Sequence, residues 1–392
     1  MRSSVVGRFP RADRLYDRAL ARMPGGNSRT SLFVAPHPPY AVSGVGCRLT
    51  DIDGHTVIDL LNNFTSLIHG HAHPKIVAAA TDAVAHGSAF GLPTEHEVDL
   101  AELLAARIPA AESWRFTNSG TEAVMMSVRA ARAFTGRDLI VRFEHSYHGT
   151  YDGVALDHSG VAEGVAGTAI VLPVADGEAL IETLESSGDR IAAVVIDAMP
   201  NHAGLVPVPA EFMRLAREAT TRCGALLVLD EVISFRVARG GMQALYDVVP
   251  DVTALGKIIG GGFPVGAVGG RTDVMEVFNP VTSDPVSHGG TFSANPVTMR
   301  AGLAAMEMMT PAEYARVNAL GERLRSELVA QGWRVNGFGS LLKLDIGATP
   351  ETWWQFYEQG VLVSPGGLAC ISTAMNDSVI DEALASFARV AA

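Results

Sequence analysis

Two stretches decide the fold: ALLVLDE at residues 225–231 and VTALGKIIGGGFPVG at residues 252–266. In each, an apolar run is followed by a reactive side chain. Both runs begin with continuous apolar residues rather than an alternating pattern, as expected for strands covered by helices on both faces. Open sheets of such strands bind ligands at the carboxyl ends of the strands. We therefore expect Asp230, which ends the first run, and Lys257, which follows the second, at that edge of a sheet.

Other parts of the chain repeat this pattern. From about residue 75, helical stretches alternate with short apolar runs, of which 139–143 and 192–197 are the clearest. Alternation of this kind predicts parallel strands joined by helical crossovers. The predicted fold class is therefore α/β, with a doubly wound, mainly parallel sheet sandwiched by helices.

The two ends of the chain carry a different pattern. Residues 47–51 and 55–59 alternate around Asp53-Gly54, a dipeptide favoured at hairpin turns because both positions tolerate positive φ. Beyond about residue 300, helical stretches and a strand-like run predict a smaller α+β domain. The predicted domains are an N-terminal arm and hairpin at 1–65, a large domain at 66–300 and a C-terminal domain at 301–392.

Composition excludes several classes of protein. Apolar residues make up 48% of the 392 residues and charged residues 18%, so the chain can bury enough surface to fold. The net charge of −12 opposes binding to nucleic acid or to an anionic membrane. The three cysteines are widely spaced, and no apolar run is long enough for a leader or a membrane span. We expect a cytoplasmic protein.

Lysine is scarce in this sequence. Only Lys75, Lys257 and Lys343 occur among 30 basic residues, a bias that an arginine-rich genome would explain. Arginine replaces lysine as a surface charge, but only lysine forms an imine or loses its proton readily when buried. The apolar and glycine-rich surroundings of Lys257 therefore indicate a chemical role, although a surface lysine beside a loop is the simpler interpretation.

A candidate phosphate site precedes a predicted helix at 123–134. Asn118-Ser119-Gly120-Thr121-Glu122 places small hydroxyl residues where the helix begins, and helix N-termini favour anions such as phosphate. Taken alone, an ordinary N-cap by Ser119 or Thr121 is favoured. The interpretation changes when Asp230 and Lys257 are added, because pyridoxal phosphate needs a phosphate cradle, an acid for its ring nitrogen and a lysine for its aldehyde. Tyr147 would stack on the ring, or else be a core aromatic.

These residues carry a resemblance to a known family. From about Tyr16 onward, the chain resembles the class III pyridoxal-phosphate aminotransferases of fold type I, in the branch of glutamate-1-semialdehyde 2,1-aminomutase and the β-amino-acid aminotransferases. The motifs that carry it are Asn118 to Ala123, Tyr147-His148-Gly149, Asp230-Glu231-Val232, Leu255 to Gly270 and Gly289 to Pro296. The resemblance implies a large cofactor-binding domain and a smaller α+β domain formed from both termini.

The resemblance also implies roles for the matching residues. Lys257 would carry the imine, Asp230 would meet the ring nitrogen, and Tyr147 and Val232 would sandwich the ring. Ser119, Gly120 and Thr121 would hold the phosphate, and Thr291 would contact the phosphate of the neighbouring subunit's cofactor. The implied assembly is a homodimer with shared active sites.

Two further residues point to the substrate. The segment around Arg29 is more similar to the β-amino-acid aminotransferases than to the aminomutase, so Arg29 would clamp a substrate carboxylate. Phe64 stands where relatives carry an aromatic residue that lines the substrate pocket. The plainer alternatives are a solvated loop arginine and a core phenylalanine.

Some positions depart from the family pattern. Asp197-Ala198 replaces the usual Glu-Pro, and residues 199–202 replace the usual turn after it. Gly366 stands where β-amino-acid aminotransferases can carry an arginine, which puts recognition of a dicarboxylic partner in doubt. Residues 150–171 form a shorter segment than the aminomutase gate. Three histidines alternate at residues 69–73, but the family's own Gly-His-x-His-Pro turn accounts for residues 70–74, so we predict no metal site.

The predicted function is therefore an aminotransferase that acts on small-molecule amino acid and keto acid substrates. An amino acid, in one version a β-amino acid, would pass its nitrogen through the internal aldimine to give pyridoxamine phosphate, which would then aminate a keto acid or aldehyde. The rival predictions are an intramolecular aminomutase of the glutamate-1-semialdehyde type and an epimerase. A cofactor-binding protein without turnover is disfavoured, because Lys257 and Asp230 are both present.

Overall fold

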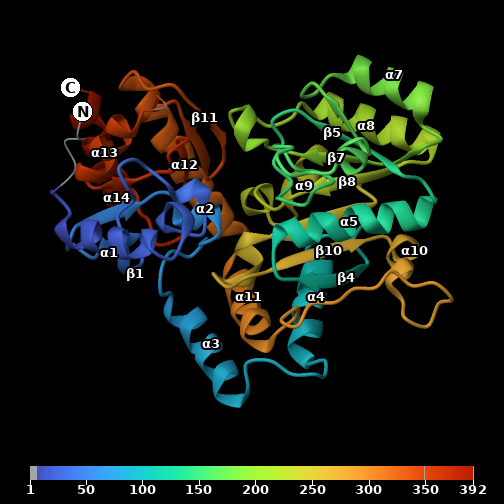
Figure 1. The fold of residues 1–392 in the computed structure, drawn as a ribbon, viewed down its shortest axis with the longest axis horizontal. Helices are drawn as coiled ribbons and strands as arrows, with labels where there is room; N and C mark the ends of the chain where they lie inside the picture. Colours follow the sequence, from blue (N-terminus) through green and yellow to red (C-terminus); the bar gives the residue numbers. More distant parts are fainter. Residues whose placement is uncertain (1–6, 348, 392) are drawn as a thin grey trace. The chain divides into compact units, whose positions relative to one another are not determined.

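The protein is described by a computed structural model that covers residues 7–347 and 349–391 (Figure 1). The chain divides into two compact units. One unit contains the residues up to His73 together with those from Ala315 onward, and the other contains Pro74–Tyr314. The unit Pro74–Tyr314 is called the large unit below, and the other is called the terminal unit.

The large unit is built on a seven-stranded sheet with the order β4-β10-β9-β8-β7-β5-β6. Strands β5 to β9 run parallel to one another, and β10 is antiparallel to both β4 and β9. The α/β class with a mainly parallel sheet is thus confirmed. The strands are β4 (Ser113–Thr117), β5 (Leu139–Phe143), β6 (Ala169–Leu172), β7 (Ile191–Asp197), β8 (Leu226–Asp230), β9 (Val252–Gly256) and β10 (Gly266–Gly270).

Helices cover this sheet because its central strands are apolar on both faces. Every residue of β5, β7, β8 and β9 is buried. Helix α5 packs on β9 and β10, and α8 packs on β8 (Figure 1). The α-helices that lie wholly in this unit are α3 (Pro74–His86), α4 (Glu95–Arg107), α5 (Gly120–Thr135), α6 (Glu163–Ala166), α7 (Gly177–Ser187), α8 (Ala210–Cys223), α9 (Gly241–Tyr246), α10 (Thr272–Met275) and α11 (Pro296–Met308).

The register of the sheet brings the ends of two strands to one edge. Asp197, the last residue of β7, pairs with Asp230, the last residue of β8. Lys257 follows the next strand, β9, directly. The main core lies behind this edge, where Ala123, Val228 and Ala254 are among the fully buried residues that pack together. The carboxyl ends of β8 and β9 therefore lie at one edge of the sheet, as predicted from the runs at 225–231 and 252–266.

The terminal unit contains two smaller sheets. Strands β1 (Ala41–Val45), β2 (Arg48–Asp51) and β3 (Thr56–Asp59) form an antiparallel sheet, to which β13 (Val361–Leu362) adds in parallel to β3. The hairpin around Asp53-Gly54 is thus confirmed. The second sheet has the order β11-β12-β14. Its strands and the remaining helices are β11 (Val335–Phe338), β12 (Leu341–Leu344), β14 (Leu368–Cys370), α1 (Pro10–Leu20), α2 (Asn62–Thr65), α12 (Pro311–Ala330, which begins in the large unit), α13 (Pro350–Glu358) and α14 (Asp377–Ala391).

Within the described residues, no helix is both long enough and apolar enough to cross a membrane.

Candidate active site at the carboxyl ends of the strands

Lys257 lies at the end of β9 in an unusual backbone conformation. Its φ is +50°, in the left-handed region that residues other than glycine rarely adopt. The side chain is only partly accessible to water, and burial lowers its pKa, while Asp230 and Asp197 act in the opposite direction. A lysine with a lowered pKa presents more of the neutral amine, which is the form that attacks an aldehyde. Its position and chemistry therefore suit an imine-forming residue.

Asp230 is held from two sides. Its Oδ1 accepts a hydrogen bond from the backbone N–H of Val232 at 3.0 Å, and its Oδ2 lies 2.8 Å from Nδ1 of His148. Asp230 is 4% exposed and His148 is 1% exposed, so water competes little for either group. A carboxylate fixed in this way is suited to meet the protonated nitrogen of a pyridine ring. His148 is a functional residue to which the sequence analysis gave no role of its own.

The phosphate candidate is the start of helix α5. Ser119 is the N-cap, and its hydroxyl accepts the N–H of Glu122 at 3.1 Å, while the Glu122 carboxylate accepts the N–H of Asn118 at 2.6 Å. This reciprocal cap fixes the first turn. The N–H groups of Gly120 and Thr121 then belong to the donors that a helix leaves without an intrahelical partner. They are a suitable cradle for an anion.

Two glycines allow the start of α5 to pack against the motifs at 147–149 and 230–232. A Cβ on Gly120 would lie 2.9 Å from Cγ1 of Val232, and a Cβ on Gly149 would lie 2.3 Å from Oγ1 of Thr121. Gly149 also has a φ of +95°. The three motifs at 118–122, 147–149 and 230–232 are therefore packed together, and only glycine permits this approach.

Tyr147 offers an aromatic face in the same region. Its side chain is 43% exposed, and its ring centroid lies 6.0 Å from that of His202 in a tilted arrangement. Partial burial raises the pKa of its phenol, so the ring stays neutral at physiological pH. A neutral ring with one open face is able to stack on a cofactor.

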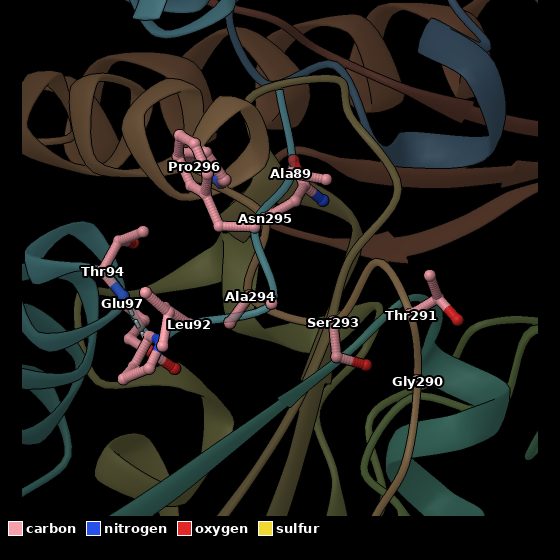
Figure 2. Close-up of a pocket in the computed structure, with 13 residues that line it drawn as sticks. Ala89, Leu92, Thr94, Glu97, Gly290, Thr291, Ser293, Ala294, Asn295 and Pro296 are labelled. Atoms are coloured by element: carbon pink, nitrogen blue, oxygen red, sulfur yellow. Dashed lines mark hydrogen bonds between the residues drawn. The ribbon is translucent and has the colours of Figure 1, made fainter. Parts of the chain in front are cut away.

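Thr291 lies in an exposed loop beside a cavity of about 290 Å³. Figure 2 shows Thr291 and Ser293 on one wall and Leu92, Thr94 and Glu97 on the other. The side-chain amide of Asn118 donates a hydrogen bond to the Ser293 hydroxyl at 3.3 Å, which ties this loop to the residue that precedes the cradle. The role of Thr291 across a subunit interface stays a prediction.

Arg29 and Phe64 lie together in the terminal unit. The Arg29 guanidinium donates to Oδ1 of Asn63 at 3.1 Å, and its Cζ lies 5.5 Å from the centre of the Phe64 ring. Asn62 to Thr65 all have positive φ, a run that is costly for residues other than glycine. Such strain is often stored at functional sites. This pairing was not foreseen from the sequence.

The structure shows the surroundings of two ionisable residues, Asp197 and Lys343, to which the sequence analysis assigned no role. Asp197 is 5% exposed, and burial together with the charge of Asp230 raises its pKa to about 7. In the terminal unit, Nζ of Lys343 lies 3.4 Å from the position of a Cβ on Gly366. The turn that lacks the expected arginine therefore has a lysine beside it. Neither residue could be placed from sequence spacing.

The groups gathered in the large unit fit pyridoxal phosphate. The fit rests on a capped helix start with free donors, glycines that leave space for it, a half-buried amine and a fixed carboxylate. Together with the sheet, they define a pyridoxal-phosphate-dependent enzyme of fold type I.

Comparison with known proteins identifies the family. The profile of aminotransferase class III matches residues 35–390, and the chain belongs to this family. Among curated relatives, the glutamate-1-semialdehyde 2,1-aminomutase of Methanothermobacter thermautotrophicus is 36% identical over 95% of this chain and 97% of that protein. The aminomutase of Thermomicrobium roseum is 41% identical over 86% of this chain and 84% of that protein.

Similar solved structures include transaminases. An omega-transaminase from Sphaerobacter thermophilus is 42% identical with a TM-score of 0.93, covering 97% of this chain and 96% of that one. A transaminase with pyridoxal phosphate bound is 41% identical with a TM-score of 0.94, covering 97% of both chains. A β-phenylalanine aminotransferase from Variovorax paradoxus is 34% identical with a TM-score of 0.90, covering 97% of this chain and 93% of that one. The family and the cofactor expected from the sequence are thus confirmed.

Proposed function

We propose that this protein is an aminotransferase that moves an amino group from an amino acid, with a β-amino acid as the leading candidate, to a keto acid or aldehyde. The observation that carries the choice of a substrate with a carboxylate is the arrangement of Arg29, which Asn63 holds at 3.1 Å and the face of Phe64 backs at 5.5 Å. A guanidinium held in this way keeps further donors for a carboxylate. The likeness to an omega-transaminase and a β-phenylalanine aminotransferase supports the same conclusion.

The residues of the large unit would divide the work. Pyridoxal phosphate supplies an aldehyde for the amino group and a ring that accepts electrons from the substrate carbon. Lys257 would bind the aldehyde and then move a proton at the substrate carbon. Asp230, oriented by His148, would keep the ring nitrogen protonated, and the first turn of α5 would bind the phosphate. Tyr147 would stack on the ring.

A second candidate is favoured by the curated relatives, which are named as glutamate-1-semialdehyde 2,1-aminomutases. An aminomutase would use the same cofactor residues but would return the amino group to the molecule that gave it. The difference is therefore in the number of substrates: transamination needs a separate acceptor, whereas the intramolecular reaction needs none.

One assay separates the two functions. Purified holoenzyme would be given 3-amino-3-phenylpropanoate with and without pyruvate or 2-oxoglutarate, and in parallel glutamate-1-semialdehyde alone. We expect sustained conversion of the β-amino acid that stops when the keto acid is omitted. Fast conversion of the semialdehyde alone to 5-aminolevulinate, with no turnover of the β-amino acid, would instead establish the aminomutase.

The carboxylate site is tested by Arg29→Ala. Loss of a charge-assisted bidentate hydrogen bond removes about 1.5–3 kcal/mol, so kcat/KM on the β-amino acid should fall roughly 10- to 150-fold. The slow reaction with 1-phenylethylamine, which has no carboxylate, should stay nearly unchanged. Equal losses on both compounds would show that Arg29 supports the fold or the cofactor rather than the substrate.

We also propose that the protein works as a homodimer with shared active sites. Phe90 and Leu92 line the cavity beside Thr291, and Phe292 follows Thr291 in the chain. These three side chains expose 52%, 78% and 60% of their surfaces in the single chain, in the order Phe90, Leu92 and Phe292. A second copy would cover such residues. Sedimentation should therefore give twice the mass of one chain, and a fully active monomer would contradict the proposal.

A further inference from the structure

Asp197 is a buried carboxylate beside Asp230 to which the reaction assigns no task. The two residues pair in register at the ends of neighbouring parallel strands. Side chains at paired positions emerge on the same face of a sheet, and neighbouring strands lie roughly 4.8 Å apart. The sheet therefore carries two adjacent carboxylates at the edge where Lys257 also lies.

Asp197 has little compensation for its charge. Its Oδ1 accepts one hydrogen bond, from the N–H of Met199 at 2.9 Å, and the ion pairs found among the described residues do not include it. Asp230, Lys257 and His148 are the charged or titratable groups that act on it from β8, the β9 end and the loop after β5. Tyr246 of α9 faces the next residue, since its hydroxyl donates to the carbonyl of Ala198 at 3.3 Å.

The consequence is a competition for protons. Two carboxylates this close and this deeply buried cannot both ionise freely. The Asp230 carboxylate has two partners, the N–H of Val232 and the His148 ring, whereas the Asp197 carboxylate accepts only the N–H of Met199, so the proton belongs on Asp197. The raised pKa of Asp197, about 7, agrees with this assignment.

We propose that Asp197 is a positioning residue of the cofactor site: it carries a proton beside the Asp230–His148 pair, and its ionisation controls how firmly the nitrogen of Lys257 and the ring nitrogen hold their protons. When Asp197 is an anion, its field retains both of those protons. When Asp197 is protonated, the field is absent. This inference needs pyridoxal phosphate on Lys257 but does not depend on whether the amino group leaves the site, so it holds for an aminotransferase and an aminomutase alike.

The test is a pH titration of the visible absorbance of the cofactor bound to the holoenzyme. Asp197→Asn keeps the shape of the side chain and removes its charge, so the spectral midpoint should move to lower pH by roughly one to three units, as when an opposite charge at close range is lost. Asp197→Glu keeps the charge and should restore most of the wild-type midpoint. An Asp197→Asn midpoint equal to that of the wild type would overturn the proposal.

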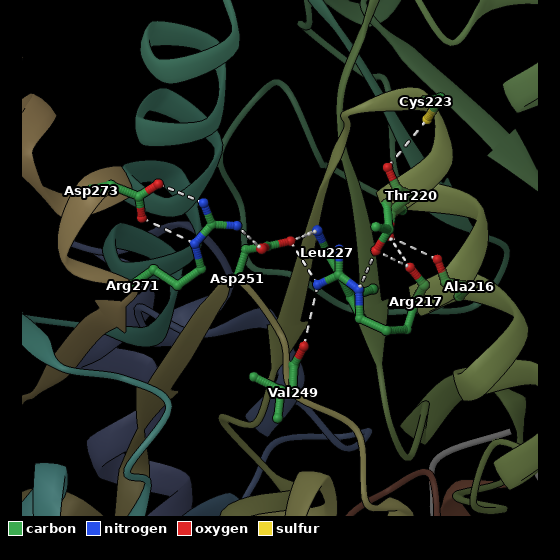
Figure 3. Close-up of polar contacts among 10 residues, drawn as sticks. Ala216, Arg217, Thr220, Cys223, Leu227, Val249, Asp251, Arg271 and Asp273 are labelled. Carbon is green, nitrogen blue, oxygen red and sulfur yellow. Dashed lines mark hydrogen bonds and ion pairs between the residues drawn. The ribbon is translucent and has the colours of Figure 1, made fainter.

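Asp251→Asn is the matched control. Asp251 is also a buried carboxylate of this sheet, but it precedes β9 and is paired with Arg217 at 2.8 Å and Arg271 at 2.6 Å (Figure 3). Its loss should lower the melting temperature without moving the spectral midpoint. A shift as large as that of Asp197→Asn would show that the midpoint reports general loosening, which would overturn the proposal.

A second measurement needs no variant. In the wild-type holoenzyme, the infrared band of a protonated carboxyl group should disappear at lower pH than the visible change, because Asp197 must be an anion for its field to raise the spectral midpoint. A carboxyl band that persists through the visible change would contradict the proposal.

Discussion

Lys257 stands out at the residue scale because the chain has few other lysines and because its amine is partly buried at φ +50°. We predict that borohydride reduction of the holoenzyme places a pyridoxyl group on Lys257, since its lowered pKa favours the attacking amine. Peptide mass mapping provides the measurement. Modification of Lys75 or Lys343 in its place would refute the assignment of the imine to Lys257.

Asp230 is the second residue whose environment specifies a role. Its carboxylate is fixed by Val232 and His148, so it can stabilise positive charge on the ring without reorganising. We predict that Asp230→Asn still binds the cofactor but lowers kcat on the order of 10²-fold or more, as when a preorganised charge partner is lost. Stopped-flow kinetics on the loaded variant would measure this. Wild-type kcat in Asp230→Asn would mean that another group serves the ring nitrogen.

At the scale of elements, the start of α5 works only because the loop at 147–149 packs against it. We predict that Gly149→Ala weakens cofactor binding at least tenfold, because its Cβ would lie 2.3 Å from Oγ1 of Thr121. Equilibrium binding to the apoprotein measures the effect. Gly136→Ala is the control: Gly136 also has a positive φ, +68°, but nothing lies within 4 Å of its Cβ. Each variant should lose about 1 kcal/mol of stability to its positive φ, with a further loss in Gly149→Ala from the clash with Thr121, and only Gly149→Ala should lose affinity. Equal affinity in the two variants would remove the proposed contact from the cradle.

At the scale of the whole molecule, Asp197 makes stability depend on pH. Its pKa is raised from 3.8 to about 7, so between these values the folded protein binds a proton that the unfolded chain has released. This contribution to stability is present below about pH 4 and is lost as the pH rises toward 7.

The corresponding prediction compares cofactor-free wild type with Asp197→Asn in denaturant titrations. The difference in unfolding free energy should grow in favour of the variant as the pH rises through this window, by up to about 1.4 kcal/mol per pH unit for a single proton. A constant difference from pH 4 to pH 8 would show that Asp197 does not bind this proton. The variant has to be compared with the wild type because other carboxylates also make stability depend on pH. Arg271 lowers the pKa of Asp273, for example, so that residue adds stability as the pH rises, and it does so equally in both proteins.

Much of the fold followed from local pattern. The run at 139–143 is strand β5, and the runs at 225–231 and 252–266 contain β8 and β9 near their starts, because a short continuous apolar run suits a strand that is covered on both faces. Helix α5 begins at Gly120, directly after the predicted N-cap. The sequence pattern did not predict β10 as a strand of its own. Its antiparallel direction is set by its pairing with β4 and β9.

The candidate site was predictable wherever a residue type is chemically indispensable. Lys257, Asp230 and the small residues at 119–121 were found because imine formation, ring protonation and phosphate binding each require one kind of group. Arg29 and Phe64 were singled out by resemblance, but their contact through Asn63 was not. A contact between residues far apart in the sequence gives no periodic pattern from which it could be predicted.

The sequence by itself determined the apolar runs that become the central strands, and which cofactor the residues at the ends of β8 and β9 suit, because these properties depend on residue type and near neighbours. Only the tertiary structure decided what surrounds each end residue. His148 meets Asp230 across 82 positions of sequence, and Asp197 becomes its neighbour through the register of two strands. Burial and charge act through space, so the proton that we assign to Asp197 could not be read from the order of residues.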